Sequence, residues 1–547
     1  MAFDTNGINL GQTMIDAALA MTENVDRVPA QFARQGRTAK WFRPRHRIVE
    51  GERTRYRVFT EPYSGARGAS FATAAASEGP IPRGLGHVQC SFGWDDVFMV
   101  RAGIKWNMMQ DLKHKNLKVA VYHLVEELFS QASLGVDEYE NIATMTPMTG
   151  ELAQVDTMYE IAQSPAGTQT PFAQTTTHTP AFMRIKGGPI TRFKKGDVID
   201  VFVADSTQVA MLKVWGVIGG ENGPPTDGVR SAGIGPGLIV EPCNTAGAVA
   251  SNSWVGAKVT GVNDTEYTSA APAAGNIITR SGEYTTPTLV AAGTAGKTFH
   301  GIPDFFDTTV PIFRDGAEAT MGDLLDREAT GNEWMNPTTI TPDGASAGSE
   351  VEFDPEEHLM ELADNWIYMV RAGRAGRKSL GVGMPDGVNQ TIEISDHLVM
   401  VCEPKMANHL TQLSANKNQF TASAAMNDAT AKRLKLIGVE GFDGWIWNSP
   451  TLNQVAIQVD TNCKPHHMFI LEPSSFFWVE PRNGHRVQWL PFSNGSRIWA
   501  ISGSGEGTLG TPTFERQAMA YTMRGLLNDQ PGANAMIEHV CTAREAA

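Results

Sequence analysis

The sequence has few cysteines and no two of them close together. It contains five, and the nearest pair, Cys402 and Cys463, is 61 residues apart; the others are Cys90, Cys243 and Cys541. Zinc sites and disulfide-rich domains use cysteines at short, repeated spacings. A CxxC-based zinc site is therefore excluded, and we expect no disulfide-stabilised fold.

Long hydrophobic runs are also missing. No apolar stretch reaches the 18 or so residues that a membrane-spanning helix needs. The first 34 residues lack a basic start followed by an apolar core, which is the pattern of a secretory signal. We expect no membrane association and a chain that is soluble and cytoplasmic when it is synthesised.

Motifs of the common enzyme classes are absent or incomplete. The sequence has no HExxH, P-loop or EF-hand pattern. Gly505–Gly510 matches GxGxxG, but Thr511-Pro512-Thr513 follows where a dinucleotide fold requires a helix. Gly344–Gly348 matches GxSxG, but it lies in a small-residue loop without the strand and helix that expose a nucleophile. We interpret both matches as loops.

One tight group of metal-ligand residue types occurs, at Cys463, His466 and His467. Adjacent residues in a strand point to opposite faces, so the two histidines would not converge on one ion. A loop leading into a strand at Met468–Leu471 is the better explanation. We therefore predict no catalytic residues, no metal site, no cofactor and no enzyme activity.

Composition favours β-structure with long loops. The 547 residues are enough for three or four domains. Hydrophobic residues make up 41%, which can fill sizeable cores, and the 54 glycines exceed the average share of about 7%. The glycines concentrate in stretches that are also rich in Ala, Ser and Thr, which argues against a helical bundle.

Charge is distributed unevenly. The formal net charge is −14, yet positions 34–57 carry nine basic residues against Glu50 and Glu52, a local +7 that leaves −21 elsewhere. This basic segment fits two partners equally well: acidic patches on the same or a neighbouring chain, or nucleic acid. Its candidate contact residues are Arg37, Lys40, Arg43, Arg45, Arg47, Arg53, Arg55 and Arg57.

Two strand-like segments, Arg47–Glu61 and Val88–Arg101, flank a loop of about 25 residues at Pro62–Gly86. Hairpin loops usually have two to five residues, and much longer loops are functional or disordered. This loop consists mainly of Gly, Ala and Ser. We expect that it cannot bury itself against its own chain.

Two helices stand out. The spacing of Leu117, Val121, Leu124 and Leu128 predicts a helix of about 24 residues that Asp111 caps and Gly135 ends. Asp354-Pro355-Glu356-Glu357 has the form of a capping box and predicts a second helix that ends at Gly373.

The stretch from Ile185 to Arg314 predicts an inserted β-rich domain, such as a small barrel. Its expected strands are Asp197–Val203, Ala210–Val217 and Gly237–Val240. Residues 206–300 contain only 11 charged residues, which argues against a surface for phosphate binding. A structural insertion is the favoured interpretation over a ligand-binding role.

The last third of the chain is mainly strands. Leu398–Cys402 predicts a buried strand and Pro404–Leu413 a short helix behind it. The further expected strands are Ala456–Val459, Met468–Leu471, Phe476–Val479, Val487–Leu490 and Ile498–Ser502, with Asn483-Gly484 and Asn494-Gly495 as turn signals.

This order of elements resembles the major capsid protein of tailed bacteriophages, the Hong Kong 97-like fold of the α+β class. The basic arm, the long hairpin with its Gly/Ala/Ser tip, the long helix, the β insertion and the alternating helices and strands carry the resemblance. It implies an N-terminal arm at 1–44, an E-loop hairpin at 45–103, a P-domain with a spine helix at 104–184, the inserted domain at 185–314, an A-domain at 315–469, and return strands and tail at 470–547.

The resemblance implies a structural role. Copies of the chain would form hexamers and pentamers of an icosahedral shell around double-stranded DNA, with the DNA held by non-specific proximity. Portal, scaffolding and decoration proteins would be partners, and the protein would reside in the virion after assembly in the host cytoplasm. Because few residues precede the hairpin, we expect a separate scaffolding protein. The hairpin tip would contact a neighbouring subunit through Ser64, Gly65, Arg67, Gly68, Ser70, Phe71, Ser77 and Glu78.

Two other classes stay open at this point. An encapsulin-like compartment shell uses the same fold, usually with a much shorter chain. A β-rich adhesin or glycan-binding protein would account for the Gly/Thr/Ala-rich middle and the 12 tryptophans.

Overall fold

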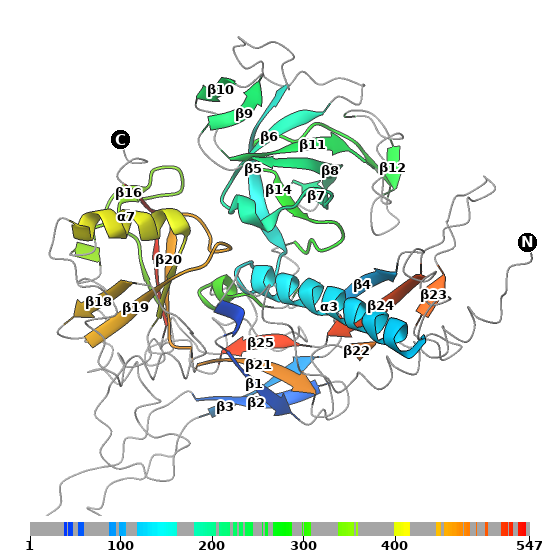
Figure 1. Cartoon of the computed structure of the whole chain (residues 1–547). Coiled ribbons are helices and arrows are strands. Elements are labelled where there is room, and N and C mark those ends of the chain that lie inside the picture. The colour runs from blue at the N-terminus through cyan, green and yellow to red at the C-terminus, as the bar shows by residue number, and fades with distance from the viewer. Residues whose placement is uncertain are drawn as a thin grey trace, which may run out of the picture.

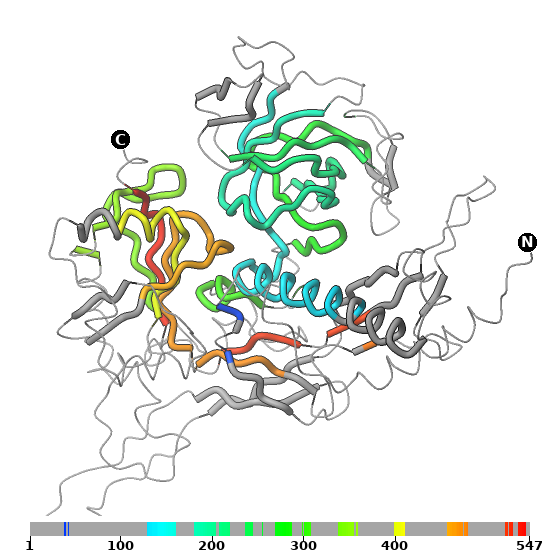
Figure 2. The backbone as a smooth tube through the Cα atoms, viewed as in Figure 1, coloured from blue at the N-terminus to red at the C-terminus, as the bar shows by residue number. Residues whose placement is uncertain are grey.

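The computed structural model of the chain describes residues 38–40, 42–47, 53–59, 87–93, 98–104, 117–160, 180–203, 207–218, 222–226, 229–232, 236–243, 254, 258–260, 266–286, 298, 300–307, 337–354, 357–358, 399–415, 445–449, 453–473, 475–481, 488–489, 498–500, 516–522, 524–528 and 534–542. In Figure 1 these residues form a long helix with a β-barrel above it, a mixed sheet to its left and further strands beneath it. Figure 2 traces the same arrangement along the backbone.

The barrel is closed by six strands. Around the barrel they run in the order β11 (Gly237–Pro242), β6 (Ala181–Lys186), β5 (Glu151–Glu160), β14 (Ile277–Arg280), β7 (Val198–Phe202) and β8 (Gln208–Ile218). Its interior is filled by apolar side chains such as Val155, Leu212 and Ile278, all fully buried. The barrel expected in this region is present, and its strands at β7, β8 and β11 match the expected ones.

The barrel starts earlier in the chain than residue 185, where the inserted domain was expected to begin. Strands β5 and β6 both lie before or across that position, and β5 pairs with β6 and β14. The strand ladder can close only when these two strands are included.

The second large unit is a six-stranded mixed sheet. Its order is β15 (Thr338–Ile340), β26 (Ala535–Glu538), β20 (His467–Leu471), β17 (Val399–Cys402), β19 (Asn453–Val459) and β18 (Trp445–Ser449). The central strands β17 and β20 are buried along their whole length, which fits the apolar sequence of β17 and of β20 after His467.

The helix α7 (Pro404–Ala415) follows β17 directly and buries Met406 and Leu410 in the core of this sheet. Its first residue is proline, whose missing N–H costs nothing in the first helical turn. The expected helix at Pro404–Leu413 and the expected strands at β17, β19, β20 and β21 are confirmed. Of the second expected helix, only residues 357–358 are described as helical.

The long helix α3 (Leu117–Thr144) does not end at Gly135 as predicted from the sequence. Nearly all side chains from Leu128 to Thr144 are buried or half-buried, so tertiary contacts surround this half of the helix. Glycine inside a helix costs about 1 kcal/mol. Packing on all sides outweighs that cost, and the helix continues beyond the glycine. The expected cap, Asp111, lies outside the described residues.

Two smaller sheets adjoin α3; in Figure 1 the first lies beneath the helix and the second lies at its right-hand end. One is three-stranded, in the order β1 (Arg43–Arg47), β21 (Phe476–Pro481) and β25 (Gly525–Asn528). In the other, β24 (Arg516–Thr522) pairs with β4 (Phe98–Ile104), β22 (Gln488–Trp489) and β23 (Ile498–Ala500).

The expected hairpin is present as an antiparallel ribbon of β2 (Arg53–Phe59) and β3 (His87–Gly93). The single strand expected at Val88–Arg101 is in fact two, β3 and β4, which belong to different sheets. Arg47 likewise belongs to β1, not to the hairpin. Both differences follow from pairing: β1 pairs with β21 and β4 with β24, while β2 and β3 pair with each other.

The remaining elements are short. They are the strand pairs β9 (Asn222–Thr226) with β10 (Val229–Ala232), β12 (Lys258–Thr260) with β13 (Glu266–Thr268), and β16 (Val351–Glu352) with β27 (Val540–Cys541), and the 3-10 turns η3 (Thr38–Lys40), η4 (Ile190–Arg192) and η6 (Ile302–Phe305). No described helix is long and apolar enough to cross a membrane.

Candidate functional site

The basic segment is divided between two strands of different sheets. Arg43, Arg45 and Arg47 occupy alternate positions of β1, beside Phe477, Val479 and Pro481 of β21. The arginines Arg53, Arg55 and Arg57 occupy alternate positions of β2, beside Gly93, Ser91 and Gln89 of β3. Alternate positions of a strand share one face. Each strand therefore places its three arginines on a single face.

The hairpin tip is not part of the described structure. All eight tip residues named from the sequence, Ser64, Gly65, Arg67, Gly68, Ser70, Phe71, Ser77 and Glu78, lie outside the described residues, as does Arg37. Lys40 ends η3, just before β1.

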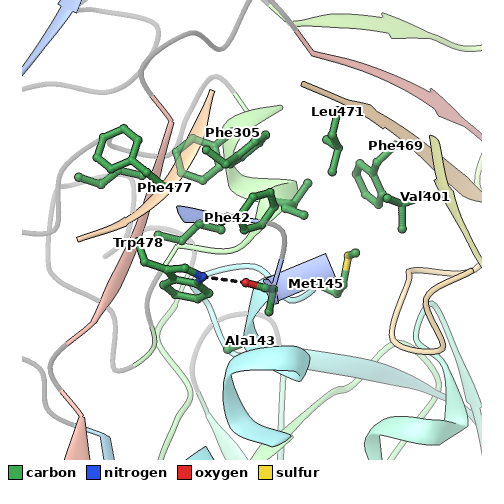
Figure 3. Close-up of a cluster of buried hydrophobic side chains, with 14 of the residues drawn as sticks. Phe42, Ala143, Met145, Phe305, Val401, Phe469, Leu471, Phe477 and Trp478 are labelled. Carbon is green, nitrogen blue, oxygen red and sulfur yellow. Dashed lines mark hydrogen bonds between the residues drawn. The ribbon is translucent and has the colours of Figure 1, made fainter. Parts of the chain in front are cut away.

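The segment before β1 is held firmly in place by buried contacts. The hydroxyl of Thr38 donates a 2.5 Å hydrogen bond to Oδ2 of Asp460, and the carbonyl oxygen of Ala39 accepts one from Nε1 of Trp478 at 2.8 Å. Phe42 packs on Phe476, with ring centroids 5.0 Å apart. Figure 3 shows Phe42 and Trp478 in the largely aromatic core that they share with Phe305 and Phe477.

Asp460 connects this segment to the six-stranded sheet. Its Oδ1 accepts a hydrogen bond from the backbone N–H of Asn462 at 2.9 Å. The carboxylate is 2% exposed, and burial raises its pKa, while the hydrogen bonds from Thr38 and Asn462 and the charge of Arg192 oppose that rise. Thr38, near the chain start, thus anchors to a carboxylate that follows β19.

Arg192 joins three parts of the fold. Its guanidinium donates hydrogen bonds to the carbonyl oxygens of Met145 after α3, Leu152 in β5 and Asn462 after β19, at 2.7 to 2.8 Å. The side chain is buried, and desolvation lowers its pKa to about 10, so the group stays charged at neutral pH. A charged donor to three backbone carbonyls fixes the barrel against α3 and the sheet.

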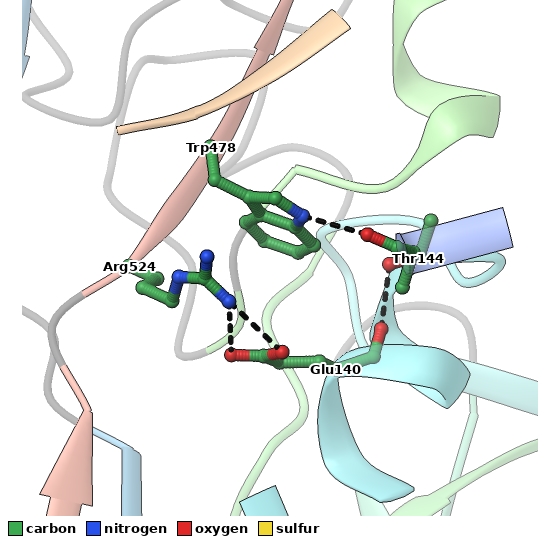
Figure 4. Close-up of polar contacts among 5 residues, drawn as sticks. Glu140, Thr144, Trp478 and Arg524 are labelled. Carbon is green, nitrogen blue, oxygen red and sulfur yellow. Dashed lines mark hydrogen bonds and ion pairs between the residues drawn. The ribbon is translucent and has the colours of Figure 1, made fainter. Parts of the chain in front are cut away.

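A buried ion pair ties α3 to β25. Nη1 of Arg524 lies 3.1 and 3.2 Å from the two carboxylate oxygens of Glu140, and the guanidinium lies over the ring of Trp478 at 5.0 Å. In Figure 4 the ring of Trp478 lies beside the Glu140–Arg524 ion pair, and its Nε1 donates the hydrogen bond to the carbonyl oxygen of Ala39. The helix α3, the strand β25 and the residues just before β1 therefore form one packed unit.

Cys463, His466 and His467, which the sequence offered as candidate metal ligands, each have other contacts in the structure. Cys463 is buried among Val401 and Phe469, and burial raises the pKa of its thiol well above the usual value. Nδ1 of His466 contacts the carbonyl oxygen of Val540 at 3.2 Å, and Nδ1 of His467 contacts that of Pro465 at 2.8 Å. Within the described part of the chain, no group of three His, Cys, Asp or Glu side chains could hold a metal ion.

The two enzyme-like glycine motifs have different outcomes. Gly344–Gly348 forms the exposed turn between β15 and β16, closed by a bridge between Ser346 and Ser349. No strand and helix flank this serine, so the interpretation as a loop holds. The GxGxxG match at Gly505–Gly510 lies outside the described residues.

Sequence reasoning missed Arg192, the Glu140–Arg524 pair and the Thr38–Asp460 bond. Partners in the last two are 384 and 422 residues apart in the chain. No local pattern marks such contacts.

Comparisons with known proteins return capsid structures. No protein-family model and no curated protein matches the sequence. Among solved structures, the chain is similar to the cyanophage A-1(L) capsid asymmetric unit, with 9% identity and a TM-score of 0.35 over 95% of this chain and 96% of that one. It is similar to the mature capsid asymmetric unit of bacteriophage PhiM1, with 9% identity and a TM-score of 0.28 over 94% and 89%. It is also similar to the capsid of Ralstonia phage GP4, with 9% identity and a TM-score of 0.29 over 92% and 87%. Each of these likenesses is a similarity at 9% sequence identity and a TM-score below 0.5.

Proposed function

We propose that this chain is the major capsid protein of a tailed bacteriophage, with a structural and not an enzymatic role. Copies of the chain form hexamers and pentamers that build an icosahedral shell around double-stranded DNA. Portal, scaffolding and decoration proteins are its proposed partners, and the virion is its proposed location after assembly in the host cytoplasm.

The observation that carries the proposal is the β2–β3 ribbon. Within the described residues, these two strands pair only with each other, and one face of β2 carries Arg53, Arg55 and Arg57. A two-stranded ribbon is marginally stable alone in water. A neighbouring copy would bury the ribbon and pair its unpaired edges, which is how a shell protein converts a protruding hairpin into contacts.

The packing of the N-terminal arm just before β1 supports the same function. Thr38 is fixed by Asp460, Ala39 by Trp478, and Phe42 by Phe476. Contacts made further along a protruding segment transmit force only if its base is rigid. Many identical weak contacts then add up to a stable shell.

We further propose that the arginine rows of β1 and β2 bind acidic surface on neighbouring subunits. The chain outside positions 34–57 carries a formal charge of −21, so a second copy offers acidic surface. The same excess of negative charge repels DNA phosphates and lets the shell hold DNA without gripping it.

The test is assembly of the full chain, followed by size-exclusion chromatography and negative-stain electron microscopy. We expect megadalton shells, or hexamers and pentamers, and fewer assemblies as salt rises, because ion pairs at the subunit surface are screened. A monodisperse monomer at every protein concentration and salt concentration would contradict the proposal. Shells that are unaffected by salt would contradict only the role of the arginines.

A further inference from the structure

Three histidines meet where the C-terminal strands join the six-stranded sheet. His467 is the first residue of β20, His466 precedes it, and His539 lies between β26 and β27. We call these three residues the histidine cluster. The rings of His467 and His539 lie 5.8 Å apart in an edge-on arrangement, and His467 also stacks on Phe469 at 6.4 Å.

The cluster holds three chain segments together. The carbonyl oxygen of His466 accepts a hydrogen bond from the N–H of Val540, and that of His539 accepts one from the N–H of Val351. Both residues have left-handed backbone conformations, with φ of 63° and 58°. Non-glycine residues adopt this region only at a cost, so surrounding contacts must hold them there. The joint between β20, β27 and β16 is therefore under local strain.

Addition of a second proton to the ring of His467 is unfavourable in the closed form. Its side chain is 7% exposed, and Nδ1 lies 2.8 Å from the carbonyl oxygen of Pro465. A carbonyl only accepts hydrogen bonds, so Nδ1 carries the proton and Nε2 is the nitrogen that would gain one. Burial, followed by the charge of Lys464, lowers the pKa of His467 to about 3; His539 and His466 lower it further, and only the Pro465 carbonyl raises it.

The other charged groups at this joint belong to the neighbouring strands. Glu538 of β26 stands opposite His467 in the ladder, and its Oε1 accepts a bond from Thr341 and lies 3.9 Å from Nε2 of His539. Glu403 follows β17, and its Oε1 accepts a hydrogen bond from the N–H of His466 at 3.4 Å. Each carboxylate therefore has another partner at the joint, and Lys464 adds positive charge beside the ring.

We propose that the histidine cluster is an acid-sensitive joint, which holds β26 and β27 in place at neutral pH and releases them on acidification. Release exposes His467 to water, where its imidazole can take a proton. The open form then gains a proton that the closed form binds only at much lower pH.

The sign of the effect follows from the lowered pKa. In the open form His467 has the ordinary histidine pKa near 6.5. Above that pH the side chain is neutral in both forms, so protonation does not favour opening. Below pH 6.5 the open form binds the proton first, and closure weakens about tenfold per pH unit until the closed form also titrates near pH 3. Between pH 6.5, where the open form is already half protonated, and pH 4.5 we expect about a 50-fold shift toward the open form.

Hydrogen–deuterium exchange of the full chain at pH 7.5, 6.5, 5.5 and 4.5 tests the proposal and does not depend on assembly into shells. Amides of residues 534–542 are compared with those of barrel strand β8, which corrects for the intrinsic effect of pH on exchange. We expect the protection of 534–542 to fall about 50-fold relative to β8 between pH 6.5 and 4.5 in the natural chain. His467→Gln and His467→Phe, which cannot gain a proton, should keep that protection.

The control is His300→Gln, because His300 is also buried and its ring and ion-pair contacts are with Phe305 and Asp304, not with residues of β26 or β27. This variant should lose protection of 534–542 in the same way as the natural chain. Constant relative protection across the pH range in the natural chain would overturn the proposal, as would an equal acid-induced loss in a His467 variant that keeps its protection at pH 7.5.

Discussion

Gly301 stands at a position where no side chain fits. A β-carbon there would lie 1.8 Å from the carbonyl oxygen of Thr146 and 2.8 Å from that of Ala143. The close approach lets Asp304 accept hydrogen bonds from the N–H groups of Gly301 and Met148 at 2.9 and 2.8 Å. A segment that follows the barrel therefore packs closely against the C-terminal end of α3.

Gly301→Ala should destabilise the chain strongly, by about 3 kcal/mol or more, because backbone atoms on both sides must move to admit the methyl group. Gly216→Ala is the control. Its β-carbon would first meet the flexible end of Ile239 at 3.2 Å, so the cost should be below about 1 kcal/mol. Urea unfolding followed by circular dichroism measures both. Equal midpoints for the two variants would show that the described packing at Gly301 is wrong.

At the scale of elements, α3 is the part to which other elements attach. The barrel strand β5 follows it, Arg192 fixes its end, and Glu140 binds Arg524 beside β25. Two acidic residues on this helix form ion pairs that differ in exposure. Glu140 is 3% exposed in its ion pair, whereas Glu138 pairs with Lys194 at 37% and 57% side-chain exposure.

Glu140→Gln should cost about 3 to 5 kcal/mol, because the guanidinium of Arg524 would remain buried without its counter-charge. Glu138→Gln should cost at most about 1 kcal/mol, since an exposed pair is screened by water and salt. The free energy of unfolding of each variant, measured in parallel with the natural chain, checks the difference. A loss for Glu140→Gln as small as that for Glu138→Gln would contradict the importance of the buried pair.

Elements with strong local signals could be predicted from the sequence. The apolar runs of β17 and β20 and the proline start of α7 gave their positions to within a few residues, because those signals lie inside the elements themselves. The end of α3 could not be predicted. Gly135 is a local stop signal, and the packing that overrides it comes from residues distant in sequence.

On the scale of the whole molecule, the described fold consists of a barrel, a mixed sheet and small sheets joined by α3, with the β2–β3 ribbon paired only with itself in the described part of the chain. Under the proposed function, the segment between β2 and β3 contacts neighbouring copies and not the folded units of its own chain. Folding and assembly should therefore be separable by deletion.

Deleting Gly65–Ser77 should leave a folded chain that fails to form shells, because the loop supplies contacts to neighbouring copies under the proposed function. Circular dichroism should match the natural chain, while electron microscopy should show no shells. A matched control replaces the same residues by a shuffled sequence of equal composition and length, which separates loop length from specific contacts. Intact particles from the deletion variant would contradict the prediction that this loop is needed for assembly.

The amino-acid sequence by itself determined the class of the fold, the strand and helix positions with clear periodicity, and the separation of a basic segment from an acidic remainder. These properties are local or compositional, so reading along the chain is enough to find them. Tertiary structure alone decided that the barrel begins at β5, that β3 and β4 belong to different sheets, and that Thr38 binds Asp460. Strand pairing and buried polar contacts join residues hundreds of positions apart, and their stability comes from the shared burial of partners that no local pattern identifies.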